Sequence, residues 1–202
     1  MQNLVDVVVK LGEVFDRLQL RYAVGGALAN NYWGTLRATE DVDCLISLPA
    51  LKYQLFADEL NAIGCTLLDG NNQHVSVTVP ELRAQAQSRK LIECYYPLAD
   101  AAVRVELFVP AVELQDEILR RAVPIRVRNR DIRVTTAEDL VLMKLFFHRV
   151  KDLQDVRGIL WVQRGQLDLD YLKSWSVRTH EPEVQQEMDQ LIAEYARKDK
   201  QE

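Results

Sequence analysis

Residues Tyr22–Ser47 read YAVGGALANNYWGTLRATEDVDCLIS, a pattern of strand, glycine turn, short helix, loop and second strand. The second strand carries Asp41 and Asp43, which project from the same face because side chains alternate along a strand. The pair Gly25-Gly26 precedes the helix, where backbone N–H groups can approach an anion closely. Carboxylates for a metal ion and a glycine turn for phosphate, so near in the chain, indicate a nucleotide–metal site.

A third acidic residue lies in the apolar segment Val103–Val109, which reads VRVELFV and predicts a strand. A carboxylate in such a strand, here Glu106, is unfavourable unless it is paired or bound to a metal. Two interpretations remain open: Glu106 joins the two aspartates as a metal ligand if their strands are neighbours, or it pairs with Arg104 or Arg37. Three oxygen ligands of this kind suit Mg²⁺, and two such ions can promote displacement at a phosphorus atom.

The order of predicted elements divides the chain near residue 135. Residues 1–134 predict an α/β (α+β) core, and residues 135–202 predict a helical C-terminal part. The predicted strands are 22–24, 42–46, 65–68, 74–79, 91–96, 103–109, 124–127 and 132–134. The predicted helices are 3–19, 27–33, 49–63, 80–90, 111–122, 137–148, 152–163, 169–175 and 181–198.

The first predicted helix of the C-terminal part carries Lys144 in an otherwise apolar run. Its charge, or that of Arg37, can balance negative charge in a transition state, and the alternative is a lysine extending to solvent from a packed face. If this helix continues unbroken, four polar residues share one face. They are Lys144, His148, Lys151 and Asp155. The alternative for Asp155 is an ion pair with Lys151 or Arg157 at helical spacing.

The composition is typical of a globular protein, since 48% of the 202 residues are hydrophobic and 27% are charged. The net charge of −5 disfavours binding of a polyanion over the whole surface. The arginines between positions 120 and 133 favour a solvated hairpin, with a local patch for RNA or an acidic partner protein as the alternative. No apolar run reaches the ~18–20 residues that span a bilayer, and the first residues lack a basic signal-peptide start. The three cysteines have no metal-binding spacing. We therefore expect a cytoplasmic protein that does not bind membranes.

The segment Val24–Ile46 resembles the signature of the nucleotidyltransferase superfamily that includes DNA polymerase β: a small-residue turn, Asp-x-Asp, and a third acid on a later strand. Its form R-A-T-E-D-V-D is similar to the AbiEii branch, which contains toxins of type IV toxin–antitoxin systems. The segment 136–160, TAEDLVLMKLFFHRVKDLQDVRGIL, is similar to the same branch. That branch has an Asp-Leu…Lys helix followed by Arg-x-Lys-Asp-x-x-Asp. The resemblance implies that the core is a mixed β-sheet with flanking helices and that the C-terminal part closes the nucleotide cleft.

The residues and the resemblance together indicate three overlapping sets of site residues. The implied metal ligands are Asp41, Asp43 and Glu106. The candidate nucleotide-binding residues are Gly25, Gly26, Arg37, Thr39, Lys144 and Asp155. The candidate catalytic residues are Asp41, Asp43, Glu106 and Lys144.

The implied activity is Mg²⁺-dependent transfer of NMP from an NTP to a hydroxyl of a protein, an RNA such as tRNA, or a small molecule. Membership of the toxin branch implies an antitoxin-like partner protein. This sequence departs from the pattern in two places: Gly-Gly-Ala replaces Gly-Ser, with Thr39 as the candidate replacement hydroxyl, and Glu106 stands where Asp is commoner. These departures leave open a catalytically weak or inactive nucleotide-binding or protein-interaction module.

Overall fold

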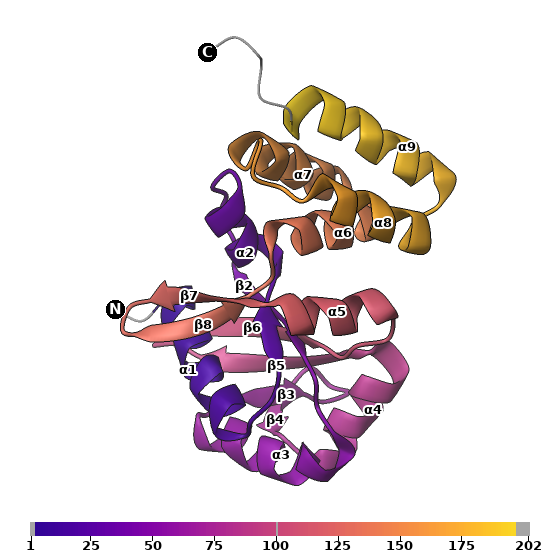
Figure 1. Cartoon of the computed structure of the whole chain (residues 1–202). Helices are drawn as coiled ribbons and strands as arrows, with labels where there is room; N and C mark the ends of the chain where they lie inside the picture. Colours follow the sequence, from indigo (N-terminus) through magenta and orange to yellow (C-terminus); the bar gives the residue numbers. More distant parts are fainter. Residues whose placement is uncertain (1–2, 100, 197–202) are drawn as a thin grey trace. The chain divides into compact units, whose positions relative to one another are not determined.

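The computed structural model describes residues 3–99 and 101–196 of the chain (Figure 1). Its described residues form two compact units. Unit 1 comprises the residues up to Gly26 together with Thr39–Val134, and unit 2 comprises Ala27–Ala38 together with the residues from Thr135 onward. Residues 27–38, which the sequence assigned to a core of residues 1–134, therefore group with the C-terminal residues. The expectation that the C-terminal part closes a nucleotide cleft stays a prediction.

Unit 1 is built on a mixed sheet, so the predicted α/β class is confirmed. The described strands are β1 (Tyr22–Val24), β2 (Asp41–Ile46), β3 (Thr66–Leu68), β4 (His74–Ser76), β5 (Leu91–Pro97), β6 (Ala102–Phe108), β7 (Val123–Val127) and β8 (Arg130–Val134). Their order across the sheet is β4-β3-β5-β6-β2-β1-β8-β7. The pairs β2–β6 and β1–β8 are parallel and the remaining neighbours are antiparallel. The strand of the aspartates and the strand of Glu106 are thus direct neighbours.

The helices of unit 1 are α1 (Leu4–Arg17), α3 (Tyr53–Ala62), α4 (Val79–Arg89) and α5 (Glu113–Arg121) among the described residues. Local sequence signals define where they begin. Asn3 caps α1 by accepting hydrogen bonds from Val5 and Asp6, and Thr78 caps α4 by accepting from Glu81. Because Thr78 is this cap, β4 ends at Ser76 and is shorter than the predicted strand 74–79.

Alternation along β2, β5 and β6 gives this part of the sheet one apolar and one polar face. The apolar positions of these strands are buried. They are Val42, Cys44, Ile46, Ile92, Cys94, Tyr96, Val103, Val105 and Leu107. Apart from the buried Leu45, the positions between them are only partly buried or exposed, and they include six polar residues. These are Asp41, Asp43, Glu93, Tyr95, Arg104 and Glu106. The sheet thus places its polar groups on one surface of unit 1.

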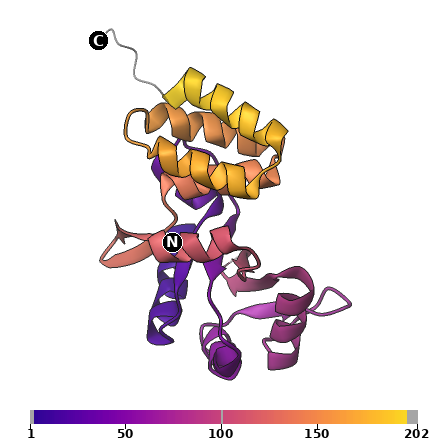
Figure 2. The same ribbon diagram turned by 45° about the vertical axis from the view of Figure 1, so that its right-hand side comes forward.

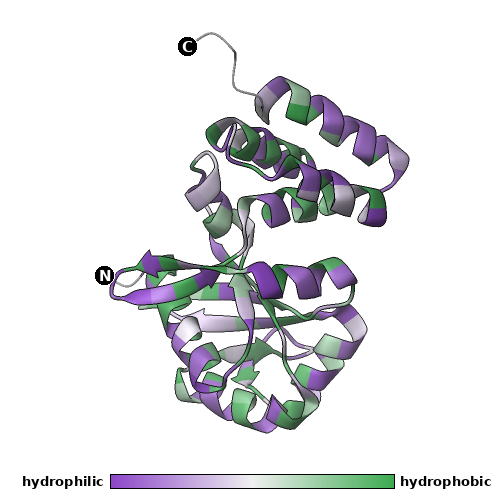
Figure 3. Ribbon diagram, viewed as in Figure 1, coloured by the Kyte–Doolittle hydropathy of each residue, from purple (hydrophilic) through white to green (hydrophobic). Residues whose placement is uncertain are grey.

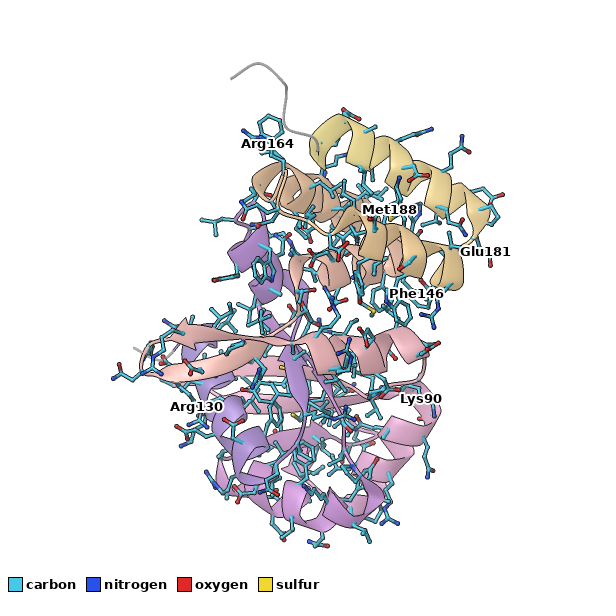
Figure 4. All side chains as sticks on the ribbon, viewed as in Figure 1. Lys90, Arg130, Phe146, Arg164, Glu181 and Met188 are labelled. Atoms are coloured by element: carbon cyan, nitrogen blue, oxygen red, sulfur yellow. The ribbon has the colours of Figure 1, made fainter. Side chains whose placement is uncertain are left out.

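Unit 2 is helical. Its described helices are α2 (Gly26–Trp33), α6 (Ala137–Phe147), α7 (Val150–Val162), α8 (Leu169–Thr179) and α9 (Pro182–Leu191), with a π-helical turn at Ile192–Ala196. The first residue of α2, Gly26, belongs to unit 1. Figure 2 shows α7, α8 and α9 side by side. Polar residues predominate on α9 (Figure 3), and its apolar Met188, labelled in Figure 4, is buried. The predicted helix 181–198 extends in part beyond the described residues. No helix among the described residues is long and apolar enough to cross a membrane.

Helix α2 joins unit 2 through hydrogen bonds and close packing at its C-terminal end. The indole N–H of Trp33 donates to the carbonyl of Thr135 at 2.7 Å, and the Gln163 side chain donates to the carbonyl of Trp33 at 2.9 Å. A Cβ at Gly34 would lie 2.9 Å from a side-chain carbon of Ile159, so α7 approaches this turn as closely as glycine permits. These contacts hold residues that are distant in sequence together in one unit.

Candidate active site

The glycine turn of unit 1 packs directly against an aspartate. Gly25 N–H donates to the carbonyl of Asp43 at 2.9 Å. Gly26 has a φ of +55°, and a Cβ at this position would lie 1.8 Å from Oδ2 of Asp43. Only glycine fits here, because a side chain would both strain the backbone and collide with the carboxylate. The turn therefore provides space for the Asp43 side chain. This explains the glycine at position 26 independently of the expected approach of a phosphate.

The predicted carboxylates converge on the polar face of the sheet. In the parallel pair β2–β6, Asp43 is the register partner of Glu106, and Asp41 is the partner of Arg104. Neighbouring strands lie about 4.8 Å apart, so the side chains of registered residues are adjacent. The expectation that the two strands are neighbours is confirmed. The roles of Asp41, Asp43 and Glu106 as metal ligands stay predictions.

Arg104 bridges two of these three carboxylates. Its Nη2 lies 2.9 Å from Oδ2 of Asp41, and its Nη1 lies 3.4 Å from Oε1 of Glu106. Of the two arginines considered as partners for Glu106, the structure therefore selects Arg104. The Thr39 hydroxyl donates to Oδ1 of Asp41 at 2.7 Å, so both oxygens of Asp41 have a partner. Thr39 thus hydrogen-bonds a candidate metal ligand. Its expected role as a replacement for the phosphate-binding hydroxyl stays a prediction.

The charge state of Asp41 follows from these contacts. Partial burial raises the pKa of this carboxyl, but the hydrogen bonds from Thr39 and Arg104 and the charge of Arg104 lower it by more. The net effect is a pKa below the ordinary aspartate value. Asp41 is therefore ionised at neutral pH, as a metal ligand has to be.

The donor chemistry of this face fits Mg²⁺, because the carboxylates are hard oxygen ligands on adjacent strands. The side-chain positions do not yet form such a site: within residues 3–99 and 101–196, no three His, Cys, Asp or Glu side chains gather closely enough to hold a metal ion. Arg104 lies between Asp41 and Glu106 and pairs with both. The three candidate ligands thus lie on one face of the sheet, with a guanidinium paired to two of them.

Strand β5 adds two residues to this face that the sequence did not single out. Glu93 is the register partner of Glu106, and Tyr95 is the partner of Arg104. The Tyr95 hydroxyl donates to Oε1 of Glu93 at 2.5 Å. Burial and this hydrogen bond raise the pKa of Tyr95 to about 12, which keeps the hydroxyl a donor. The alternation in LIECYYP is the signal for these residues, but only the β5–β6 pairing places them beside Glu106.

Lys144 and Asp155 form a buried ion pair in unit 2. The Lys144 ammonium lies 2.6 Å from Oδ2 of Asp155, and the two side chains are 6% and 4% exposed. A lysine that extends to solvent is therefore ruled out as the interpretation of Lys144. The alternative partners considered for Asp155, Lys151 and Arg157, are replaced by Lys144 and Arg37.

Arg37 shares Asp155 with Lys144. Its Nε lies 3.0 and 3.2 Å from the two carboxylate oxygens of Asp155. The Asn31 side chain hydrogen-bonds both the N–H and the carbonyl of Arg37 at 2.9 Å, which fixes this backbone position. The neighbouring Asp152 pairs with Arg149 at 2.6 Å. Three cations thus surround two carboxylates in unit 2. The nucleotide-binding roles of Arg37, Lys144 and Asp155 stay predictions.

The structure contains the two separate helices that the sequence predicted at 137–148 and 152–163, with slightly different bounds, so the condition for one shared helical face is not met. Helix α6 ends at Phe147, His148 has a left-handed φ of +53°, and α7 begins at Val150. His148 lies 2.5 Å from Oε2 of Glu187 on α9 instead of sharing a face with Asp155. Lys144 and Asp155 meet because two separate helices pack together, which spacing along one helix could not predict.

The arginine run divides between two elements: Arg120 and Arg121 lie on α5, and the remaining arginines lie on the hairpin formed by β7 and β8 that the first interpretation expected. The hairpin arginines with acidic partners are Arg126 with Asp131, Arg128 with Asp6, and Arg130 with Asp16. Figure 4 labels Arg130, whose partner lies on α1. Arg133 donates to the carbonyl of Ala122 at 3.2 Å. With its charges compensated in this way, the hairpin gives no support to a patch for RNA.

Comparison with known proteins places the fold in one class. No protein-family model matches the chain, and no curated protein matches its sequence. Among solved structures, an antigenic nucleotidyltransferase-like protein from Paracoccidioides brasiliensis is similar over 96% of this chain and 94% of its own, with a TM-score of 0.50 and 15% identity. ANT(2″)-Ia in complex with adenylyl-2″-tobramycin is similar over 87% of this chain and 95% of its own, with a TM-score of 0.51 and 12% identity.

The fold of this chain is therefore similar to that of nucleotidyltransferase-like proteins. At such identities the likeness concerns the fold alone. Within that class, the match to the AbiEii branch rests on the motifs of the sequence and stays a prediction.

Proposed function

We propose that this protein is a metal-dependent nucleotidyltransferase that transfers NMP from an NTP to a hydroxyl group and releases pyrophosphate. One observation supports this most: Asp43 lies against Gly26 and is registered with Glu106 across β2 and β6. The superfamily signature contains a small-residue turn, Asp-x-Asp and a third acid on a later strand, and in this chain the two strands that carry the acids are neighbours. The nucleotidyltransferase-like fold of the solved neighbours agrees with this assignment.

In this proposal the chain's own residues bind, orient and neutralise the substrate. Asp41, Asp43 and Glu106 hold Mg²⁺, which when bound supplies charge neutralisation at the reacting phosphate. Gly26 is the first residue of α2, and the first N–H groups of a helix have no intrahelical partner, so they suit a phosphate. Lys144 is the candidate for a further phosphate contact.

The proposal is tested by pyrophosphate release from each of the four NTPs, using wild type and Asp43→Asn. Asn keeps the shape of Asp43 but removes its charge, so turnover should fall on the order of 100-fold or more. Asp131→Asn, in the exposed hairpin, is the matched control and should retain wild-type turnover. Equal turnover in wild type and a folded Asp43→Asn variant would mean that these carboxylates do not perform the chemistry.

The acceptor can be identified in the same reaction with NTP labelled at the α-phosphate. ANT(2″)-Ia was solved with an adenylylated antibiotic, which makes a hydroxyl-bearing small molecule one acceptor to offer. An RNA such as tRNA and a protein are the other two acceptor classes to offer. The AbiEii-like motifs favour a toxin role with an antitoxin-like partner. Label in only one of the three acceptor classes, lost in Asp43→Asn, assigns the class. A toxin role also requires that expression arrests growth of the wild-type strain but not of the Asp43→Asn strain.

A second candidate function is nucleotide binding with little or no chemistry. The position of Arg104 between Asp41 and Glu106 favours it, because the carboxylates are paired in a way that a working metal site cannot keep. This candidate predicts NTP binding by calorimetry without pyrophosphate release. If calorimetry detects no NTP binding with or without Mg²⁺, both candidate functions are wrong.

A further inference from the structure

Arg104 lies at the centre of the acidic face of unit 1. Its neighbours across the sheet are Asp41 on β2 and Tyr95 on β5, and it makes ion pairs with Asp41 and with Glu106. Its side chain is 46% exposed, whereas those of Asp41 and Glu106 are 29% and 19% exposed. The guanidinium side chain is therefore more exposed than either carboxylate with which it pairs.

A cation at this position compensates strong repulsion. Glu93 and Glu106 are register partners on adjacent strands, and Asp43 is the register partner of Glu106 on the other side. Like charges at directly opposed positions destabilise a sheet. The hydrogen bond to Asp41 and the charge of Glu106 accordingly raise the pKa of Arg104 above the ordinary arginine value. Compensation of this kind can come from the guanidinium or from a bound divalent cation.

We infer that Arg104 is a displaceable counter-ion of this face: it pairs Asp41 with Glu106, and it must turn away before a divalent cation can be bound by both. The inference rests on the proposed function, because it concerns the same carboxylates. A divalent ion such as Mg²⁺ requires carboxylate oxygens at about 2.0–2.1 Å in nearly octahedral directions. Oδ2 of Asp41 and Oε1 of Glu106 are the oxygens that Arg104 contacts, so the two cations compete for them.

Two consequences follow for this chain. Metal affinity in the absence of nucleotide is set partly by the strength with which Arg104 holds Asp41 and Glu106. Pairs as exposed as these are weak, so their removal should tighten binding by about three- to tenfold and no more. Arg104 then serves as a positioning residue that keeps the carboxylates ordered, and it need not contact the reacting atoms.

The test is titration with Mn²⁺ alone, read from the electron paramagnetic resonance signal of the free ion. Arg104→Gln should bind Mn²⁺ about three- to tenfold more tightly than wild type. Arg104→Lys keeps the charge but cannot bridge two carboxylates with a planar fork, so its affinity should lie between the two. Arg126→Gln removes the same charge from the exposed hairpin of unit 1 and should match wild type, since salt screens distant charges.

Equal or weaker Mn²⁺ binding by Arg104→Gln overturns the inference, because a competitor cannot be removed without a gain in affinity. If the variants do not fold, the inference can still be tested on the wild-type protein by NMR. The guanidinium ¹⁵N–¹H resonances of Arg104 should shift as Mg²⁺ is added, and resonances that stay unchanged at saturation overturn the inference. If wild type turns over NTP while the Mn²⁺ affinities are equal, only this inference fails. If wild type neither binds Mn²⁺ nor releases pyrophosphate, the proposed function fails with it.

Discussion

The close contact between Gly26 and Asp43 leaves no room for a side chain at position 26. A Cβ there would lie 1.8 Å from Oδ2 and 2.5 Å from Cγ of Asp43, and the φ of +55° disfavours any side chain. We predict that Gly26→Ala destabilises the protein by about 1–3 kcal/mol, since the backbone is strained and Asp43 has to move. Urea unfolding measures this free energy. Mn²⁺ titration should show weaker binding in the same variant.

Gly70 provides the matched control for this substitution. Nothing lies within 4 Å of a Cβ built at Gly70, so Gly70→Ala should change the free energy of unfolding by less than about 0.5 kcal/mol. If Gly26→Ala unfolds at the same urea concentration as Gly70→Ala, the contact with Asp43 does not constrain the turn.

The residues of the candidate site differ in how far the sequence could predict them. The shared face of Asp41 and Asp43 follows from strand alternation, which is a local property. The side chain placed beside Asp43 depends on which strand pairs with β2 and in which register, and the register selects Glu106. Arg104 was considered only as a partner for Glu106, because its contact with Asp41 exists solely through that same register. Glu93 stayed unrecognised for the corresponding reason on β5.

At the level of elements, helices α6 and α7 are joined by the ion pair between Lys144 and Asp155. Asp155 holds both Lys144 and Arg37, whereas the oxygen of Asp152 lies 3.9 Å from the Lys144 ammonium, much farther than that of Asp155. We predict that Asp155→Asn destabilises the protein by about 3–5 kcal/mol, because two cations lose their shared partner in a buried position. Lys144→Met should cost only about 1–2 kcal/mol, because Asp155 keeps Arg37.

Urea unfolding measures the difference in unfolding free energy between the two variants. Asp170→Asn is the control for the loss of one negative charge in unit 2, because Asp170 is exposed on α8. The control should lie within about 0.5 kcal/mol of wild type. An Asp155→Asn variant as stable as Lys144→Met would show that Arg37 does not depend on Asp155.

The break between α6 and α7 lies where the sequence predicted the end of one helix at 148 and the start of the next at 152. Nothing between Phe147 and Val150 is a glycine or a proline, so no local helix breaker marks its exact position. The left-handed conformation of His148 occurs together with its contact to Glu187, which is 39 residues further along the chain. No local pattern contains such a long-range contact, so the sequence did not predict the conformation of His148. Lys144 and Asp155 nevertheless meet, but through packing of two helices.

On the scale of the whole molecule, the two units are not the two halves of the sequence. Helix α2 follows β1 and the glycine turn directly in the chain, yet Ala27–Ala38 group with the residues after Val134. The change in character near residue 135 was visible as a loss of strand patterns. The membership of α2 was not visible, because it depends on Trp33, Gly34 and Arg37 contacting residues more than a hundred positions later.

This discontinuous unit makes a prediction about cooperative unfolding. If unit 2 unfolds locally as one body, the amides of α2 should lose hydrogen-exchange protection together with those of α7, and not with those of β1 next to it in the chain. Native-state exchange at increasing denaturant, read residue by residue by NMR, measures this grouping. Asp155→Asn should lower protection in α2 and α7 by the same free energy while β1 and β2 keep theirs, because Asp155 holds Arg37 and Lys144 within unit 2. Exchange of α2 in step with β1 in both proteins would instead mean that chain continuity, and not the contacts of Trp33 and Arg37, determines where α2 belongs.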